Sequence, residues 1–337
     1  MQYGKIKGVD KKASRFIIGT MNINDPSARP DQLARLDDAW EQGVNVLDSA
    51  YSYGAPNVGA TEIALGKWLL SRKINRDDIV ITTKCGHPDY IDFDPFLSRS
   101  TLHDYDMEMQ LNTSLTKLHT DYVDVLYLHR DDPDTTIAEI IDTLNKFKKQ
   151  GKVLAFGAAN WNYDRIKEAN DYAAATGQQG FSIVEEHYSL AEMIADPFTA
   201  GSGTISGPKY AADRQALVDA GIPVASYSAL SGGFCTGRFT RKAFAADPGK
   251  FPEGVRIGYC GDDNFTRVER AAELAKEKGL TVPQICMAYT MSGPLTVLPI
   301  IGAANKAELL NTLSTLEIRL TKAECDYIDL TSDERPF

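Results

Sequence analysis

The stretch Arg15-Phe16-Ile17-Ile18-Gly19-Thr20-Met21-Asn22-Ile23 decides the fold of this 337-residue chain. Arg15–Gly19 is a short aliphatic run of the kind found in strands that are buried on both faces. An open sheet that binds a dinucleotide carries a glycine-rich turn directly after an early strand. Here Thr20-Met21-Asn22-Ile23 follows instead. This absence favours a closed barrel over an open sheet.

Short runs rich in Val and Ile recur along the chain, and amphipathic segments separate them. In Pro30–Glu41, for example, the apolar residues have helical spacing, and Gly43 is placed to end the helix. Strands that alternate with helices predict parallel βα units, so we expect an α/β protein with a (β/α)₈ TIM barrel. The predicted strands are Arg15–Gly19, Val44–Ser49, Ile79–Lys84, Val123–His129, Leu154–Asn160, Ser182–Tyr188, Pro223–Ser228 and Thr296–Gly302. The predicted helices are Pro30–Glu41, Thr61–Leu70, Thr101–Leu118, Thr136–Lys149, Tyr163–Ala174, Tyr210–Ala220, Phe265–Lys278, Val282–Met291 and Lys306–Leu316.

The chain shows no linker, repeat or low-complexity stretch, so we predict one barrel domain over residues 1–337. Met1–Lys12 indicates an N-terminal β-hairpin around Gly8-Val9-Asp10, and we expect it to close the bottom of the barrel. Three long connections follow strand ends: Cys85–Ser100, Ser189–Pro208 and Ala229–Asp263. Long loops are usually functional, and active sites of such barrels lie at the carboxyl ends of the strands. We therefore expect these loops to form the walls of a substrate pocket.

The composition limits the classes of partner. The formal net charge is −10 and no dense basic patch occurs, which argues against binding to nucleic acid or to an anionic membrane. The five cysteines are odd in number and form no CxxC pair, which indicates free thiols in a reducing compartment. The N-terminus lacks an apolar signal segment, and no apolar run reaches the roughly 18 residues that span a bilayer. We therefore expect a cytoplasmic protein.

Polar residues stand at the ends of four predicted strands. The second strand runs into Asp48-Ser49-Ala50-Tyr51-Ser52-Tyr53-Gly54, and the next ones end at Lys84, His129 and Asn160. Reduction of a carbonyl group needs a proton donor within hydrogen-bond reach. A tyrosine is a weak acid, but a neighbouring cation lowers its pKa. Tyr53 could therefore donate the proton beside Lys84, with Asp48 holding the ammonium and neutral His129 orienting the carbonyl oxygen.

Each of these residues also has a plain structural interpretation. One acid or lysine at a strand end usually forms a salt bridge, and His129 alone could be a hydrogen-bonded core histidine. Tyr51 is a rival to Tyr53 as the proton donor. The placement of all four at successive strand ends is what favours an active site.

Taken together, these motifs resemble those of the aldo-keto reductase family over nearly the whole chain. Its D-[ST]-A-x-x-Y-G motif matches Asp48–Gly54, its strand-three lysine matches Lys84, and its leucine-histidine motif matches Leu128-His129. The resemblance implies a catalytic tetrad of Asp48, Tyr53, Lys84 and His129. It also implies NAD or NADP as cofactor and a small carbonyl substrate, and we expect no metal. Among the five histidines no pair has zinc spacing, which argues against a metal-dependent hydrolase using His129, Asp131 and Asp132.

Further matches concern the cofactor. Gly157-Ala158-Ala159-Asn160-Trp161 resembles the family's G-x-S-N-[FW] segment, in which serine and asparagine hold the nicotinamide carboxamide; Ala159 lacks that hydroxyl. Glu185 stands where the family usually has a glutamine, and a glutamate donates a hydrogen bond only when it is protonated. Tyr227 is implied to stack on the nicotinamide, the alternative being core packing. The implied cofactor contacts are Gly19, Thr20, Met21, Asp48, Asn160, Glu185, Tyr227, Ser228, Leu230, Arg238, Gly302, Asn305 and Glu308.

The last matching segment departs from the family. Pro299–Lys306 aligns with the adenosine-phosphate loop, where members that use NADP carry serine, lysine or arginine, but this chain offers Ala304, Asn305 and Glu308. Lys306, with Arg238 as a substitute, is the available cation. The loop therefore favours NAD.

The leading hypothesis is an oxidoreductase that transfers a hydride between the nicotinamide and a carbonyl or alcohol. Glu185-Glu186-His187 suggests a hydroxylated ligand such as a sugar, although Glu186 and His187 could equally face a helix. The alternative is a nicotinamide-binding regulatory subunit with little turnover. The expected pocket residues are Tyr51, Tyr53, His129, Trp161 and His187, with Met21, Glu186, Cys85 and His87 as further candidates.

Overall fold

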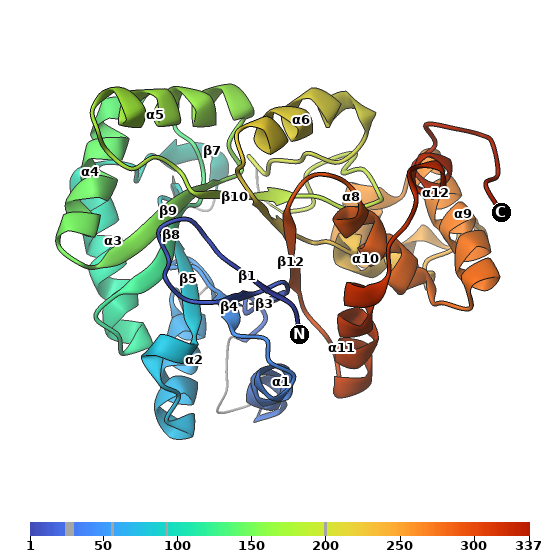
Figure 1. Ribbon diagram of the computed structural model, residues 1–337, viewed down its shortest axis with the longest axis horizontal. Coiled ribbons are helices and arrows are strands. Elements are labelled where there is room, and N and C mark those ends of the chain that lie inside the picture. Colours follow the sequence, from blue (N-terminus) through green and yellow to red (C-terminus); the bar gives the residue numbers. More distant parts are fainter. Residues whose placement is uncertain (24–29, 55–56, 92–93, 199–200) are drawn as a thin grey trace. The chain divides into compact units, whose positions relative to one another are not determined.

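Eight strands form where the sequence predicts them, each within two residues of the predicted ends. In the computed structural model, which describes residues 1–23, 30–54, 57–91, 94–198 and 201–337, they form a closed parallel barrel. The barrel strands are β3 (Ile17–Gly19), β4 (Val46–Asp48), β5 (Val80–Cys85), β8 (Val123–Leu128), β9 (Val153–Ala159), β10 (Ile183–His187), β11 (Val224–Tyr227) and β12 (Val297–Ile301). Their order around the barrel is β10-β11-β12-β3-β4-β5-β8-β9 (Figure 1). The predicted α/β barrel is confirmed.

The chain divides into two compact units. The first contains Met1–Glu185 and Gly302–Lys306, and the second contains Glu186–Ile301 and Ala307–Phe337. A single domain over residues 1–337 stays a prediction.

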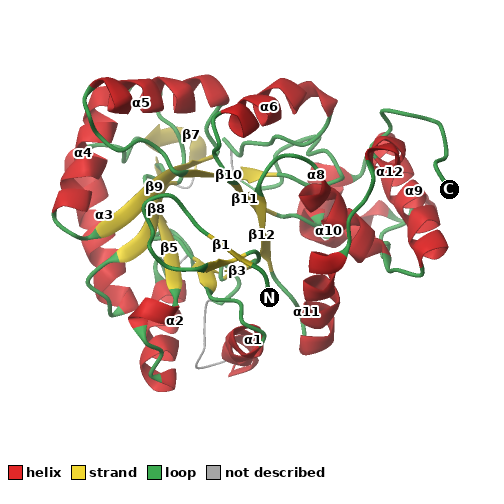
Figure 2. Cartoon of the chain, in the orientation of Figure 1, coloured by secondary structure: helices red, strands yellow, loops and turns green. Residues whose placement is uncertain are grey.

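In the first unit, parallel pairing runs without a break from β3 to β10 through β4, β5, β8 and β9. Every residue of β5 and β8 is buried, as expected for strands covered on both faces. The helices are α1 (Pro30–Glu41), α2 (Ala60–Arg72), α3 (Asp104–Leu118), α4 (Ile137–Lys149) and α5 (Tyr163–Ala175). Helices α2 to α5 pack on one another in sequence order, outside the strands (Figure 2).

The N-terminal hairpin lies at the amino ends of the strands. Strand β1 (Tyr3–Gly4) pairs antiparallel with β2 (Ala13–Ser14). Lys11 Nζ lies 2.8 Å from Asp124 Oδ1 on β8 and donates to the carbonyl of Ile79, just before β5. The hairpin is therefore tied to the end of the first unit opposite the predicted reactive residues.

In the second unit, β11 pairs in parallel with β12. The predicted helices here are confirmed as α6 (Ala211–Asp219), α9 (Asp262–Lys278), α10 (Val282–Ser292) and α11 (Lys306–Leu313), the last of which begins on a residue of the first unit.

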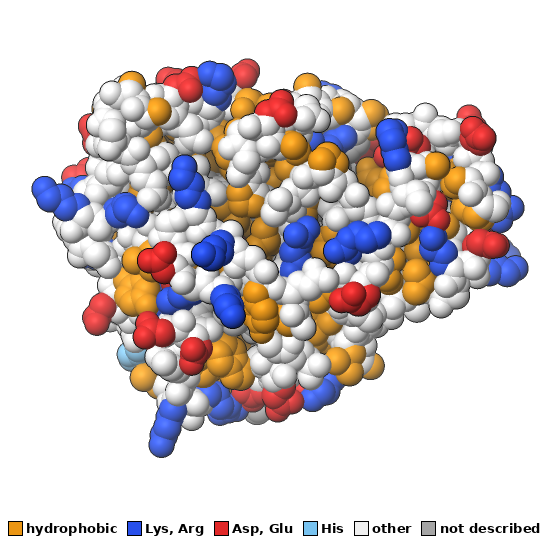
Figure 3. All heavy atoms as spheres, in the orientation of Figure 1, with side chains coloured by type: hydrophobic (Ala, Val, Ile, Leu, Met, Phe, Trp, Pro, Cys, Tyr) orange, Lys and Arg blue, Asp and Glu red, His pale blue; other side chains and the backbone are white. Residues whose placement is uncertain are grey.

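None of the helices in the described part of the chain combines the length and apolar character that crossing a bilayer requires. On the face shown in Figure 3, acidic and basic side chains both occur, with hydrophobic ones between them.

Two of the long connections contain secondary structure that the sequence analysis did not predict. The connection after β5 holds the antiparallel pair β6 (Asp89–Ile91) and β7 (Asp94–Arg99), and the one after β11 holds α7 (Arg241–Ala246) and α8 (Glu253–Tyr259). A further helix, α12 (Lys322–Ile328), follows α11. Residues 92–93 and 199–200 lie outside the described residues. The role of these connections as pocket walls stays a prediction.

Candidate functional site

Lys84 is the centre of a polar cluster inside the first unit. It lies near the end of β5, and only 1% of its side chain is exposed. Its ammonium donates to both carboxylate oxygens of Asp48, at 2.7 Å to Oδ1 and 2.6 Å to Oδ2. It also donates to the carbonyl oxygen of Ser49 at 2.9 Å. These three bonds fix the position of the charge.

Asp48 is held in turn by the strands on either side of β4. Thr82 on β5 donates its hydroxyl to Asp48 Oδ1 at 2.8 Å. Thr20, which follows β3, donates both its amide and its hydroxyl to the backbone carbonyl of Asp48, at 3.1 and 2.7 Å. The hydroxyl of Thr20 is thereby engaged within the protein. Gly19 ends β3, and Met21 is exposed.

Glu185 joins the same cluster from β10. Its Oε1 lies 3.2 Å from Lys84 Nζ, and the residue is buried. Burial and the nearby Asp48 carboxylate together raise the pKa of Glu185 to about 8. Burial alone would lower the pKa of Lys84, but Asp48 and Glu185 outweigh it and raise that pKa. One ammonium therefore serves two carboxyl groups.

Tyr53 reaches this cluster from the turn after β4. Lys84 Nζ lies 5.0 Å from the centroid of the Tyr53 ring. The turn needs Gly54, which has φ +94°, because a Cβ there would stand 2.9 Å from the Cβ of Ala60. The rival Tyr51 instead lies beside Lys117, whose Nζ is 5.2 Å from its ring centroid. The geometry favours Tyr53 over Tyr51.

The electrostatics of Tyr53 differ from the expectation. Burial raises the pKa of Tyr53 above its ordinary value. Lys84 acts in the expected direction and lowers the pKa, but Asp48 and Glu185 act against it. The expected net lowering was wrong because it left out burial, which is the largest effect, and the two carboxyl partners of the cation.

His129, which follows β8, stands beside Tyr53. The ring centroids of His129 and Tyr53 are 5.8 Å apart at an interplanar angle of 79°, and Ser52 Oγ lies 3.3 Å from His129 Nδ1. Burial and the nearby charges of Arg130 and Lys84 place the pKa of His129 well below its usual value. The imidazole is therefore neutral at physiological pH. His87, after β5, lies edge-on to it with ring centroids 4.9 Å apart.

Asn160 and Trp161 follow β9 in the same unit. Asn160 adopts the left-handed region with φ +63° and donates its side-chain amide to the carbonyl oxygen of His129 at 3.0 Å. Such strain is typically stored at functional sites. Trp161 is buried and packs edge-on against Phe181, with ring centroids 5.4 Å apart. Its pocket role stays a prediction.

Gly302–Lys306 also belongs to the first unit. Lys306 Nζ lies 2.8 Å from Asp38 Oδ1 and 3.1 Å from Glu41 Oε2, both on α1. The cation of the predicted phosphate loop is thus engaged by two carboxylates. Asn305 precedes it in the loop, and Glu308 lies in the first turn of α11.

In the second unit, the segment after β11 makes a tight turn. Ser228 and Ser231 have φ of 49° and 53°, and Gly232 and Gly233 follow with φ of 62° and 94°. A Cβ on Gly233 would stand 2.6 Å from Arg238 Nη2, so the guanidinium of Arg238 lies over this turn. Leu230 is in the same segment. Successive left-handed residues turn backbone amides toward one side, a shape that suits an anion.

Other predicted residues of the second unit have partners inside the protein. Tyr227 donates its hydroxyl to the carbonyl oxygen of Gly203 at 2.7 Å. His187 is fully buried, and its Nδ1 lies 2.9 Å from Thr204 Oγ1. Glu186 is buried as well. These contacts weaken the case for Glu186 and His187 as surface groups that meet a sugar.

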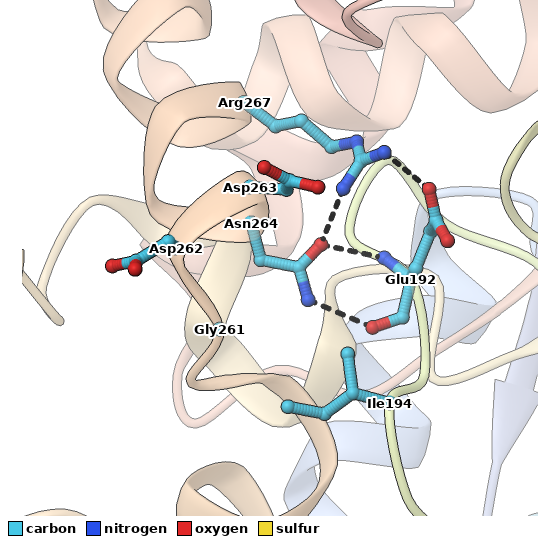
Figure 4. Close-up of a pocket in the computed structure, with 7 residues that line it drawn as sticks. All are labelled: Glu192, Ile194, Gly261, Asp262, Asp263, Asn264 and Arg267. Carbon is cyan, nitrogen blue, oxygen red and sulfur yellow. Dashed lines mark hydrogen bonds and ion pairs between the residues drawn. The ribbon is translucent and has the colours of Figure 1, made fainter.

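A pocket of about 230 Å³ lies in the second unit, beside the amino end of α9 (Figure 4). Asn264 accepts from the amide of Glu192 and donates to its carbonyl, both at 2.8 Å. Arg267 donates to Asn264 and pairs with Glu192. This network joins α9 to the loop after β10 and serves the fold. Among the described residues, no three His, Cys, Asp or Glu side chains are placed to share a metal ion.

Sequence reasoning missed the bond between Glu185 and Lys84. The signal was present, because Glu185 departs from the expected glutamine, but a sequence does not show which neighbour a buried carboxyl meets. The closeness of His87 to His129 was also missed, although His87 was a candidate pocket residue.

Three comparisons relate this chain to known proteins. A model of the Aldo/keto reductase family matches residues 15–333. A putative aryl-alcohol dehydrogenase of Saccharomyces cerevisiae is 29% identical over 352 residues, covering 97% of this chain and 86% of the relative. Norsolorinic acid reductase A of Aspergillus parasiticus is 28% identical over 306 residues, covering 90% and 71%. A thermostable aldo-keto reductase solved with the inhibitor epalrestat matches with a TM-score of 0.72 at 20% identity, covering 98% of this chain and all of that chain.

Proposed function

The chain belongs to the aldo/keto reductase family, and from that premise we propose that it transfers a hydride between a nicotinamide cofactor and a small carbonyl compound, with Tyr53 as the proton donor. The observation that carries the proposal is the cluster of Asp48, Lys84, Tyr53 and His129 at the carboxyl ends of neighbouring strands. A lysine buried only to form a salt bridge would not need a tyrosine and a neutral histidine beside it.

Each residue has a separate task in the proposed reaction. Tyr53 donates its hydroxyl proton to the carbonyl oxygen as negative charge develops there. Lys84 favours the tyrosinate that remains, and Asp48 keeps the ammonium in place. His129, kept neutral by burial, lies close enough to Tyr53 to orient the same carbonyl oxygen. In alcohol oxidation the proton moves in the opposite direction.

The residues present suit a nicotinamide dinucleotide, which supplies or accepts the hydride when bound. Glu185 carries a buried oxygen, Oε2, without a hydrogen-bond partner among the described residues, and it is a fitting group for the carboxamide. Asn160, strained at the end of β9, is the second such group. In the second unit, taken by itself, the turn from Ser228 to Gly233 with Arg238 over it suits an anionic phosphate group. Gly302–Lys306 would hold the adenosine end.

The cofactor proposed is NAD in preference to NADP. A 2′-phosphate is normally bound by arginine, lysine or hydroxyl donors. Lys306 is engaged by Asp38 and Glu41, and Glu308, two residues further on, adds a carboxylate in the first turn of α11. The loop therefore offers a 2′-phosphate little attraction.

The proposed substrate is a small aromatic aldehyde or the corresponding alcohol. The rings of His87, His129 and Tyr53 lie edge to face in the first unit, and such surfaces suit a flat ring. The yeast relative is named for aryl alcohols. A hydroxylated, sugar-like substrate is the second candidate. The argument for it depends on Glu185, Glu186 and His187, but Glu185 pairs with Lys84 and His187 bonds to Thr204 within the protein.

A matched pair of variants tests the function. Tyr53→Phe should reduce kcat for aldehyde reduction by at least about 10²-fold, because general acid catalysis typically contributes about 10²–10⁴-fold. Cofactor affinity, read from nicotinamide fluorescence, should change little. Tyr51→Phe is the control and should keep most of the activity. If Tyr53→Phe kept more than a tenth of the wild-type rate, Tyr53 would not be the acid. A panel of aryl aldehydes and sugars, assayed with both cofactors, distinguishes the two substrate classes.

A further inference from the structure

Two carboxyl groups from different strands share one buried ammonium. Asp48 on β4 lies 2.6 Å from Lys84 Nζ, and Glu185 on β10 lies 3.2 Å from it. Both acids and the lysine are buried. A single ammonium balances one carboxylate, so two ionised acids would leave an excess negative charge among buried side chains, where a charge is costly.

The neighbours of Glu185 do not remove this excess. The charged groups that act on Glu185 are Asp48 and Lys84. Tyr127 on β8 and Tyr53 after β4 also lie near Glu185. Burial raises the pKa of each phenol, and a negative charge on Glu185 raises it further. Both phenols are neutral at physiological pH, so they supply no cation. His129, on the other side of Tyr53, is neutral as well.

The hydrogen bonding of Glu185 points in the same direction. Its Oε1 meets the ammonium of Lys84, but Oε2 is buried without a hydrogen-bond partner among the described residues. An ionised carboxylate would leave that oxygen charged and unsolvated, which is costly. A neutral carboxylic acid tolerates the position better, and its O–H can donate to the neighbouring Asp48 carboxylate. The pKa of about 8 that burial and Asp48 give Glu185 agrees with this.

We propose that Glu185 is a positioning residue that works as a neutral carboxylic acid and so leaves the charge of Lys84 free to act on Tyr53. The inference rests on the proposed function of Tyr53 as the acid. When Glu185 loses its proton, the new negative charge offsets Lys84 and makes Tyr53 a weaker acid. Aldehyde reduction should therefore fall as Glu185 ionises.

The protonation state can be measured without any catalysis. Infrared spectra of the unliganded protein at pH 6.5 should contain a carboxylic-acid carbonyl band that Glu185→Gln removes and that fades as the pH rises to 9.5. Glu62→Gln is the matched control, because Glu62 on α2 is also fully buried, accepts from Thr83 at 2.7 Å and has a pKa raised by burial. That variant should leave the Glu185 band in place. If Glu185→Gln removed no acid band at pH 6.5, Glu185 would be ionised and the proposal wrong.

The effect on Tyr53 is measured by the pH profile of kcat/KM for reduction of an aryl aldehyde. In the wild type and in Glu62→Gln, kcat/KM should fall about tenfold between pH 7 and pH 9.5 as Glu185 loses its proton. In Glu185→Gln, the amide cannot ionise, so the fall should be less than about threefold. Equal profiles in the wild type and Glu185→Gln would overturn the proposal.

The outcomes separate this inference from the proposed function. If Tyr53→Phe remained active, the assignment of the acid would fail whatever the infrared bands showed. If Tyr53→Phe were inactive but Glu185→Gln left the pH profile unchanged, Tyr53 would remain the proposed proton donor. The proposed role of Glu185 would then be wrong.

Discussion

At the scale of single residues, the position of Lys84 depends on a few short bonds. Asp48 and Ser49 accept from its ammonium on one side, and Glu185 meets it on the other. Thr82 and Thr20 hold Asp48. Removing one group of such a cluster also disables the others, so the effects of single substitutions should not multiply.

A double-mutant experiment tests this coupling. Lys84→Met should lower kcat about 10²-fold or more, because Tyr53 loses the neighbouring cation that favours tyrosinate. Asp48→Asn should lower it less, because the ammonium keeps its bonds to Ser49 and Glu185. The double variant should be only slightly slower than Lys84→Met alone. The measurement is steady-state kcat of all four proteins, and a double variant as slow as the product of the two single effects would contradict the coupling.

The identities of the proposed acid, cation and neutral histidine could be predicted from the sequence because each lies near or just after the carboxyl end of a strand. Parallel strands bring their carboxyl ends together, so order along the chain is enough to assemble Asp48, Lys84 and His129. The net charge around Tyr53 could not be predicted. It depends on Glu185, which lies 101 residues beyond Lys84 in the sequence and faces it only once β10 has paired with β9.

At the scale of elements, long segments were predictable and short ones were not. Nine predicted helices form, and the turn after α1 has Gly43 at φ +81° as expected. The pair β6 and β7 and the helices α7 and α8 are seven residues long or shorter. Such segments contain too few helical turns, or too few alternating strand positions, for their hydrophobic periodicity to be recognised. Local contacts decide them instead.

The bond between the cofactor loop and α1 leads to a prediction about cofactor choice. Wild-type enzyme should use NAD(H) at least as well as NADP(H). The double variant Asp38→Asn, Glu41→Gln should free Lys306 and raise kcat/KM for NADP(H) relative to NAD(H) about three- to tenfold, the size of effect expected from one exposed charge. Adding Lys306→Met should abolish the gain. A hundredfold preference of the wild type for NADP(H) would refute this interpretation of the loop.

At the scale of the whole molecule, buried titratable groups determine how stability depends on pH. Burial lowers the pKa of His187 to about 3 and keeps that of His129 well below normal. Below the ordinary histidine pKa of about 6.5, the unfolded chain binds protons that the folded protein does not. Stability therefore falls as the pH falls below that value. Glu185 acts in the opposite sense, since its raised pKa favours the folded state at low pH and that contribution is lost as the pH rises to about 8.

The histidine contribution can be measured from unfolding at several pH values. Between pH 6.5 and pH 5, each buried neutral histidine should lower the free energy of unfolding by about 1.4 kcal/mol per pH unit. His187→Gln should reduce this slope by up to about 1.4 kcal/mol per pH unit, the value for one proton. The amide of glutamine can still bond to Thr204 but cannot titrate. His119→Asn, at an exposed helix end with φ +54°, is the control and should keep the wild-type slope. An unchanged slope in His187→Gln would show that this histidine is protonated in the folded state.

The burial of Lys84 has a practical consequence for covalent attachment chemistry. Reagents that acylate amines need an accessible, unprotonated nitrogen, and Lys84 is 1% exposed and bonded to carboxylates as an ammonium. Lys306, in contrast, is about half exposed. Coupling the enzyme to a resin or a dye through its lysines should therefore spare the reactive centre. Any inactivation during such labelling would point to an exposed lysine.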